Sequence, residues 1–402
     1  MAEGSSYQLP DLLSLTRDFE LRTNRHCRSV VEASNDWFLD LNTEADAQVL
    51  TEVEIKHAPG LKAGLLASLC FPTCDLPQLR LAADFIGLLL ISNERVKTGG
   101  MEAFGWDAIS PDERGSFNKT GFIELLEGHA LLKHLVPRLS RLRSITTPRW
   151  QKQFTTSLLA LRDAQSNAIK YRRNGTVLAL DDYVDLSRDL SGLRAVFDLV
   201  ESSEGLNLDL TEMTLDDADD FRMLRRVAAE TIALSFDIFS LNNDQLAGNR
   251  LNVVEVLMSE RCISLQAAVN EAGHLVKDKF DAFKELETSL WARHPRENAN
   301  GSSAAGPKEQ GATLGATLST WIRKPRSLSR SSSRTNLAAL FSASEASKWD
   351  TSTANDASLF LQGLKDCMGG SLHWSYETEL FFGSKGEAIR NFGWIFLSSQ
   401  DG

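Results

Sequence analysis

The 402-residue sequence lacks the features of a secreted, disulfide-linked or membrane-spanning chain. Its five cysteines are odd in number and widely spread, so they form neither a disulfide framework nor a zinc-ligand spacing. The N-terminus shows no basic segment followed by a long apolar run. The most apolar stretch, residues 79–91, is too short to span a bilayer. We therefore expect a cytoplasmic protein without a membrane span.

Positive charge is also scarce. Lys and Arg number 43 against 54 Asp and Glu, which gives a formal net charge of -11. Such a chain does not attract nucleic acid or an anionic membrane by bulk charge. The sequence contains no phosphate-binding loop, dinucleotide fingerprint, nucleophile elbow or zinc-protease motif either. These absences favour a small-molecule site of another kind.

Helical periodicity is what the chain has in abundance. Apolar residues recur at three- and four-residue spacing over residues 61–69, 122–135 and 253–283, and strand-like alternation is rare. We predict an all-α protein in which residues 79–91 form a buried central helix. We interpret the acidic run at residues 216–220 as structural, because acids are favoured at the start of a helix.

One segment, residues 297–349, breaks the helical pattern. It is rich in Ser, Ala, Gly and Thr and carries a basic patch, and the pattern resumes at Ala357. We predict a single domain spanning residues 1–402 that contains this segment as a flexible insertion. A scaffold function built on the basic insertion is an alternative to a function in the helical domain.

Residues 236–254, FDIFSLNNDQLAGNRLNVV, resemble the second metal-binding helix of the fungal class I sesquiterpene cyclases, which are terpene synthases. In that family Asn or Asp, then Ser, then Glu follow at four-residue intervals, which puts three oxygen ligands for Mg²⁺ on one helix face. Here the face reads Phe236, Ser240 and Asp244, so an aromatic ring replaces the first ligand. Further segments resemble the family in the same order: LPDLL, FPTCDLPQLRLAADF, YVDLSRDLSG and SLHWSYETELFFG.

The resemblance implies a bundle of helices around a central apolar pocket. It also implies a Mg²⁺-dependent reaction that converts farnesyl diphosphate to a cyclic hydrocarbon and diphosphate. Cyclases of this kind stabilise the departing diphosphate with Mg²⁺ and cationic donors, and then guide a carbocation within the apolar pocket.

Two further motifs depart from the family pattern. The aspartate-rich motif reads SNERVK, where Lys97 stands in place of the last acid. The Arg-Tyr pair that donates to diphosphate in the family is replaced by Leu380 and Phe381. The candidate metal ligands are therefore Ser240, Asp244, Asn93 and Glu94.

The sensor segment keeps the family pattern. Arg188, Ser191 and Gly192 stand where the family places a diphosphate-sensing arginine, a linker and a helix-break effector. A guanidinium fork suits phosphate oxygens, and a glycine lets the backbone open toward the substrate. The departures elsewhere resemble those of the humulene-forming cyclases of fungal tropolone sesquiterpenoid pathways, in which a lysine assists diphosphate binding. That resemblance implies such a lysine here and humulene as the product. Lys277 and Lys279 are the two candidates for the lysine, and we select Lys279, which shares a helix face with Leu275.

Aromatic faces stabilise passing carbocations, although an aromatic residue on a buried helix is more often plain core packing. The candidate substrate-pocket residues are Phe85, Phe236, Phe239, Leu275 and Trp374. One competing hypothesis is a catalytically inactive relative that binds an isoprenoid or a protein partner. Another is a chain-lengthening prenyltransferase, which needs two intact aspartate-rich motifs that this sequence does not have. The oligomeric state stays open, with a homodimer as one alternative.

Overall fold

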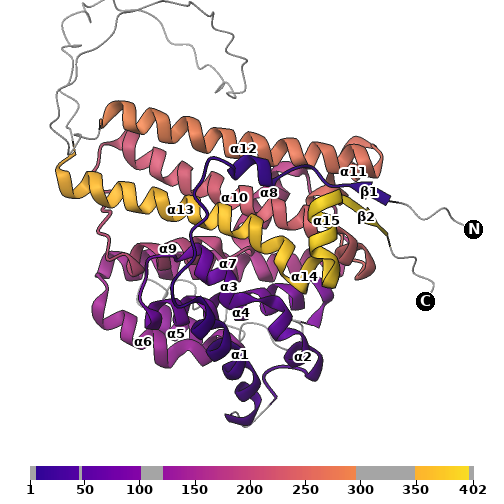
Figure 1. Ribbon diagram of the computed structural model, residues 1–402, viewed down its shortest axis with the longest axis horizontal. Coiled ribbons are helices and arrows are strands. Elements are labelled where there is room, and N and C mark those ends of the chain that lie inside the picture. The colour runs from indigo at the N-terminus through magenta and orange to yellow at the C-terminus, as the bar shows by residue number, and fades with distance from the viewer. Residues whose placement is uncertain (1–5, 45–47, 101–120, 296–348, 398–402) are drawn as a thin grey trace, which may run out of the picture.

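The computed structural model describes residues 6–44, 48–100, 121–295 and 349–397, which are almost entirely helical (Figure 1). The first helices are α1 (Cys27–Glu44), α2 (Glu52–Leu61), α3 (Ala63–Cys70), α4 (Leu76–Thr98), α5 (Phe122–Glu127), α6 (Val136–Ile145), α7 (Pro148–Asn174), α8 (Leu180–Leu190) and α9 (Leu193–Ser203). The later ones are α10 (Leu215–Leu246), α11 (Val253–Arg261), α12 (Leu265–Arg293), α13 (Thr351–Glu377), α14 (Glu379–Phe382) and α15 (Gly386–Phe392). Short 3₁₀ helices occupy Leu13–Thr16, Leu132–Leu135 and Gly383–Lys385. The all-α prediction is confirmed.

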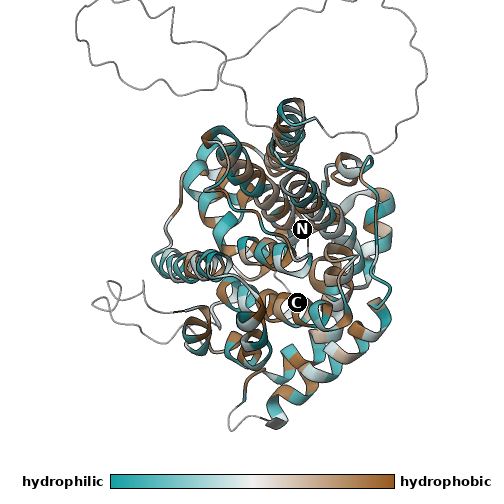
Figure 2. Ribbon diagram, turned by 90° about the vertical axis from the view of Figure 1, so that its left-hand side faces the viewer, coloured by the Kyte–Doolittle hydropathy of each residue, from teal (hydrophilic) through white to brown (hydrophobic). Residues whose placement is uncertain are grey.

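The long helices lie in layers around one core. Helices α12, α10 and α13 run side by side across one half of the molecule, and α3 and α4 follow beyond α13 (Figure 1). Each long helix carries both hydrophobic and hydrophilic residues (Figure 2), as expected for amphipathic helices that share a core. The buried apolar side chains form one contiguous cluster. No described helix is long and apolar enough to cross a membrane.

Helix α4 is the buried central helix that the sequence predicts. Asp75 and Gln78 form a capping box at its start, Pro77 occupies its first turn, and Gly99 ends it with a φ of 87°. Most of its side chains between Leu79 and Val96 are buried, so nearly the whole circumference of the helix is covered by other elements. Its C-terminal turn, which carries the altered aspartate-rich motif, is thereby fixed in position.

Helix α10 begins where the acidic run stands. Thr214 caps the helix by accepting the Asp217 amide, and Asp217 in turn accepts hydrogen bonds from Arg293 at the end of α12. The structural interpretation of residues 216–220 is therefore confirmed for Asp217. Residues 296–348 lie outside the described part of the chain, so the flexible insertion stays a prediction. Its expected last residue, Trp349, belongs to the fold, because its ring stacks on His294 at 3.9 Å between centroids.

The chain breaks between α8 and α9 at Gly192, as the sequence predicts. Gly192 has a φ of 70°, in the left-handed region that L-residues rarely adopt. A Cβ atom there would lie 2.7 Å from the side chain of Leu89 on α4. The break therefore presses directly against the central helix.

The described ends of the chain meet in the only two strands of the described residues. Strand β1 (Ser6–Gln8) pairs antiparallel with β2 (Trp394–Phe396), with Tyr7 opposite Ile395. Both of these side chains are buried, which attaches the ribbon to the core.

Candidate functional site

The end of α4 meets α10 at the two altered metal motifs. Lys97, in the last turn of α4, directs its Nζ toward Ser240 Oγ at 3.1 Å and Asp244 Oδ2 at 3.4 Å. The three residues come from segments more than 140 positions apart, since Lys97 and Ser240 are separated by 143 residues. The structure thus brings together the two segments assigned to metal binding. It joins them through a lysine ammonium.

The carboxylate of Asp244 is surrounded by donors. Its Oδ2 accepts the Ser240 hydroxyl at 2.5 Å and the Asn252 amide at 2.8 Å, and its Oδ1 accepts the Asn249 amide at 3.1 Å. Ser240 and Asp244 lie one turn apart, so they share a face of α10 as the sequence predicts. Together with Lys97, these donors engage both carboxylate oxygens.

The other two candidate metal ligands stand on α4. Asn93 Oδ1 accepts from Gln165 Nε2 at 3.4 Å. The Glu94 carboxylate makes no hydrogen bond or ion pair with a described residue, and it lines a cavity of about 640 Å³ between α2, α4 and α14. Leu380, from the altered Arg-Tyr pair, lines the same cavity. Burial raises the pKa of Glu94, while the nearby Lys97 ammonium acts in the opposite direction.

These residues do not form a divalent-metal site as they stand. Mg²⁺ requires near-octahedral coordination by oxygen atoms. Phe236 offers no oxygen, and the carboxylate of Asp244 is already engaged by Lys97 and by two amides. Within the described ranges, no group of three or more His, Cys, Asp or Glu side chains is arranged to hold a metal ion. Metal binding by the four candidate ligands stays a prediction.

Asp237 is a buried acid beside this site that the sequence left unassigned. Its Oδ2 accepts the Tyr183 hydroxyl at 2.6 Å and the Val253 amide at 3.3 Å. Burial raises the pKa of Asp237 to about 7, although Lys97 and the hydrogen bond from Tyr183 lower it. Asp237 therefore fixes α8 and α11 against α10.

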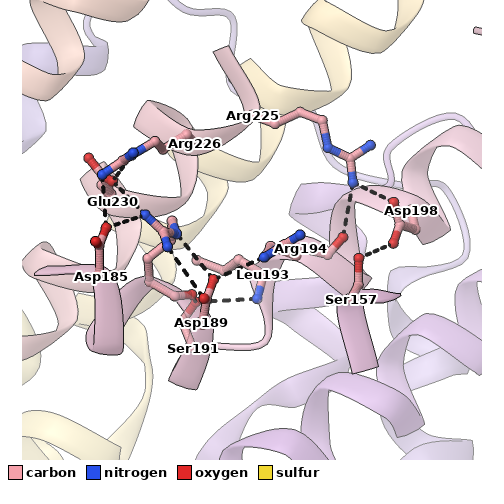
Figure 3. A network of polar contacts seen from close by, with 11 residues as sticks. Ser157, Asp185, Asp189, Ser191, Leu193, Arg194, Asp198, Arg225, Arg226 and Glu230 are labelled. Carbon is pink, nitrogen blue, oxygen red and sulfur yellow. Dashed lines mark hydrogen bonds and ion pairs between the residues drawn. The ribbon is translucent and has the colours of Figure 1, made fainter. Parts of the chain in front are cut away.

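Arg188 lies at the end of α8 in a network of acids. Its Nη1 donates to Asp185 at 2.6 Å and to Glu230 at 3.2 Å, and its Nε donates to Asp189 at 3.1 Å. Figure 3 shows Asp185, Arg226 and Glu230 gathered at one end of this network. The guanidinium is therefore paired with acids of α8 and α10 and makes no contact with Asp244. Its role as a diphosphate sensor stays a prediction.

Glu230 is the acid on which the predicted cationic residues converge. Its carboxylate is 1% exposed. Lys279 Nζ from α12 lies 2.7 Å from Oε2, and Arg226 Nε donates to Oε1 at 2.7 Å. Lys279 and Arg188 are thus brought together, but around Glu230 and not around the candidate metal ligands. Sequence reasoning missed Glu230, and the one available signal was its four-residue spacing from Arg226.

The linker residue Ser191 fixes the end of α8. Its hydroxyl donates to the backbone oxygen of Arg188 at 2.6 Å and accepts the amide of Leu193 at 3.3 Å. Gly192 follows with the positive φ that the turn requires. The predicted sensor, linker and effector residues therefore form one continuous turn between α8 and α9 that lies against α4.

Three of the five predicted pocket residues form a single aromatic cluster with Phe381. The ring of Phe236 lies 5.6 Å from that of Trp374 and 5.5 Å from that of Phe381, and Phe239 lies 6.0 Å from Phe381. Trp374 is held in place by donating its Nε1 to the backbone oxygen of Leu61 at 3.0 Å. Phe236 is the only one of these four rings that is partly exposed.

The other two predicted pocket residues lie apart from this cluster. Phe85, on α4, is fully buried and packs on Phe154 of α7 at 6.2 Å between ring centroids. Phe154 in turn stacks on Trp150, which makes this a separate aromatic group. Leu275, on α12, is partly buried against the core. The contacts of Phe85 are those of core packing.

Comparisons with known proteins point to one family. Residues 118–282 match the family described as terpene synthase family 2, C-terminal metal binding. The chain is 26% identical over 383 residues to sesquiterpene synthase 6 of Postia placenta, covering 95% of this chain and 92% of the relative. It is 26% identical over 392 residues to sesquiterpene synthase Agr1 of Cyclocybe aegerita, covering 95% and 90%. The solved structure of a-eudesmol synthase is similar in fold, with a TM-score of 0.60 at 14% identity over 89% of this chain and 96% of that one.

Proposed function

We propose that this chain is a class I terpene synthase related to the fungal sesquiterpene synthases, and that it cyclises farnesyl diphosphate and releases diphosphate. The observation that carries the proposal is the meeting of α4 and α10. The two segments that resemble the diphosphate-binding motifs of the family contact each other there, through Lys97 and Asp244. The aromatic cluster around Phe236 begins two turns earlier on the same helix.

The reaction breaks the allylic C–O bond, and the diphosphate leaves with the bonding electron pair. The carbocation then closes a ring by attack of a double bond, and loss of a proton gives a hydrocarbon. Cationic side chains stabilise the departing anion, and Lys97, Arg188 and Lys279 are the candidates in this chain. Aromatic faces stabilise the cation without reacting with it, for which Phe236, with its partly exposed ring, is well suited.

Magnesium is the divalent ion that we propose, since the candidate ligands are hard oxygen donors and the matched family is described as metal binding. The engagement of Asp244 by Lys97 and two amides argues against an ion resident on α10. If Mg²⁺ takes part, Asn93 and Glu94 on α4 would be the candidate ligands outside α10, and the ion would supply positive charge to stabilise the departing diphosphate. Humulene is the product proposed by resemblance.

A catalytically inactive relative is the second candidate, and one observation favours it. The candidate cations are neutralised within the protein, Lys97 by Asp244 and both Arg188 and Lys279 by Glu230. An incoming diphosphate must compete with these carboxylates. Such a protein would keep the fold and bind an isoprenoid or a protein partner without ionising it.

The test is incubation of the purified protein with farnesyl diphosphate, with and without Mg²⁺, followed by analysis of the organic extract. Geranyl and geranylgeranyl diphosphate test the chain length of the substrate. We expect a Mg²⁺-dependent cyclic sesquiterpene that is lost in Arg188→Ala and Lys279→Ala. Lys277→Ala is the matched control, because Lys277 lies on the same helix and, among the described residues, forms an ion pair only with the half-exposed Asp281. A folded protein that forms no product from any of the three diphosphates would support the inactive relative.

A further inference from the structure

Ser240 and Asp244 form a cation-binding site on one face of α10, which we call the cation seat. Their side-chain oxygens lie one turn apart, and both are buried. Lys97 reaches this cation seat from α4, and its Nζ lies 3.1 Å from the Ser240 hydroxyl and 3.4 Å from the Asp244 carboxylate. An ammonium donates three hydrogen bonds and accepts none, so it suits a pair of oxygen acceptors. The side chain of Lys97 is only 17% exposed, so it is held at this place by the packing around it.

The carboxylate oxygens of Asp244 also accept hydrogen bonds from the segment that follows α10. Asn249 donates to Oδ1 and Asn252 donates to Oδ2. Asn252 also donates to the backbone oxygen of Asp237 and caps α11, so its position is fixed from several directions. A divalent ion could bind Asp244 only after displacing the ammonium, because two cations at one carboxylate oxygen repel each other. It would also have to break the hydrogen bonds from the two amides.

We propose that Lys97 is a tethered cation whose ammonium takes the place of a divalent metal ion on α10. Ser240 and Asp244 then bind no divalent ion in the substrate-free protein. The positive charge at this seat is single and covalently attached, so it does not depend on the concentration of free metal. This role of Lys97 rests on the proposed function only for its contribution to catalysis. Metal binding is measured without turnover, so failure of the cyclase proposal leaves the test intact.

The first test compares the wild-type protein with Asp244→Asn, using Mn²⁺ alone as the probe. Mn²⁺ prefers carboxylate and other oxygen ligands, as Mg²⁺ does, and the loss of its free electron paramagnetic resonance signal counts the bound ions. We expect the two proteins to bind the same number of Mn²⁺ ions with the same affinity. A Mn²⁺ site that is present in the wild-type protein and lost in Asp244→Asn would overturn the proposal.

The second test removes the tethered charge. Lys97→Met keeps most of the side-chain volume and removes the ammonium from Asp244, while the two amide hydrogen bonds remain. We therefore expect one additional Mn²⁺ site, with an affinity above that of any site in the wild-type protein. Asp244→Asn in the same variant should abolish that site, and Lys97→Arg, which keeps the charge, should not create it. A folded Lys97→Met protein that gains no Mn²⁺ site would refute the proposal. If Lys97→Met does not fold, the comparison of the wild-type protein with Asp244→Asn decides.

Discussion

Replacing Glu230 by Gln tests the network that surrounds the predicted diphosphate sensor. The change keeps the shape of the side chain and removes one buried negative charge. Three cations lose their shared partner: Arg188 at 3.2 Å, Arg226 at 2.7 Å and Lys279 at 2.7 Å. Glu230 is 1% exposed, so water cannot take over the interactions that its carboxylate makes with these cations in the folded protein.

The size of the effect follows from how far each cation can reach water. Removing one partner of a fully buried ion pair costs roughly 3–5 kcal/mol. The side chains of Arg226 and Lys279 are 45% and 30% exposed, so they can be solvated after the substitution. Arg188 is 13% exposed but keeps Asp185 and Asp189 as partners. We therefore expect Glu230→Gln to lower the free energy of unfolding by about 2 kcal/mol, below the range for a fully buried pair.

Urea unfolding followed by far-ultraviolet circular dichroism measures this loss, since the fold is helical. Glu32→Gln is the matched control, because Glu32 and Arg28 form an exposed i, i+4 pair on α1. We expect this control to lose at most about 0.5 kcal/mol. If the loss in Glu230→Gln is no larger than in the control, the reasoning is refuted, because the buried carboxylate then contributes no net stability through its cations.

Two further predictions concern pH and the helix break. Burial lowers the pKa of His129 to about 3, whereas a histidine in the unfolded chain has a pKa near 6.5. The neutral side chain therefore contributes stability above about pH 6.5, and this contribution is lost as the pH falls toward 3. His129→Gln should therefore reduce the difference in unfolding free energy between pH 7 and pH 4.5 by roughly 2–3 kcal/mol, and an unchanged difference would contradict this. Gly192→Ala should destabilise the protein by about 1–3 kcal/mol more than Gly175→Ala, because both have positive φ but only at Gly192 would the new Cβ meet Leu89. Equal losses in urea unfolding would show that Leu89 moves aside at no cost.

Local features of the fold were within reach of the sequence. The strongly apolar composition of residues 79–91 predicted the buried α4, and the acidic residues at 216–220 predicted the start of α10. The glycine at 192 marked the break between two helices, because its conformational freedom is needed there. Each of these depends on residues that are near one another along the chain. The pairing of β1 with β2 joins residues almost 400 positions apart, and no local sequence pattern predicts it.

The contacts of the candidate site were less accessible, because periodicity shows which face of a helix is buried but not what covers it. The sequence showed Lys97 as the loss of an acid, and it did not show that the ammonium contacts Ser240 and Asp244. It gave Lys279 as a diphosphate donor, whereas the structure pairs it with the unforeseen Glu230. Which acid a cationic side chain pairs with depends on their distance in the folded protein, and the sequence alone does not give that distance.

The stacking of Trp349 on His294 has a consequence for how this protein can change over evolution. The two rings clamp the end of α12 to the start of α13, on either side of residues 296–348. The entropy of closing a chain segment between fixed ends grows only with the logarithm of its length, so each doubling costs about 0.6 kcal/mol. For the flexible insertion that the sequence predicts, insertions and deletions between the two rings would therefore change the stability of the helical bundle very little. Selection for stability would then act on the contact between Trp349 and His294 and leave the number of residues between them almost unconstrained.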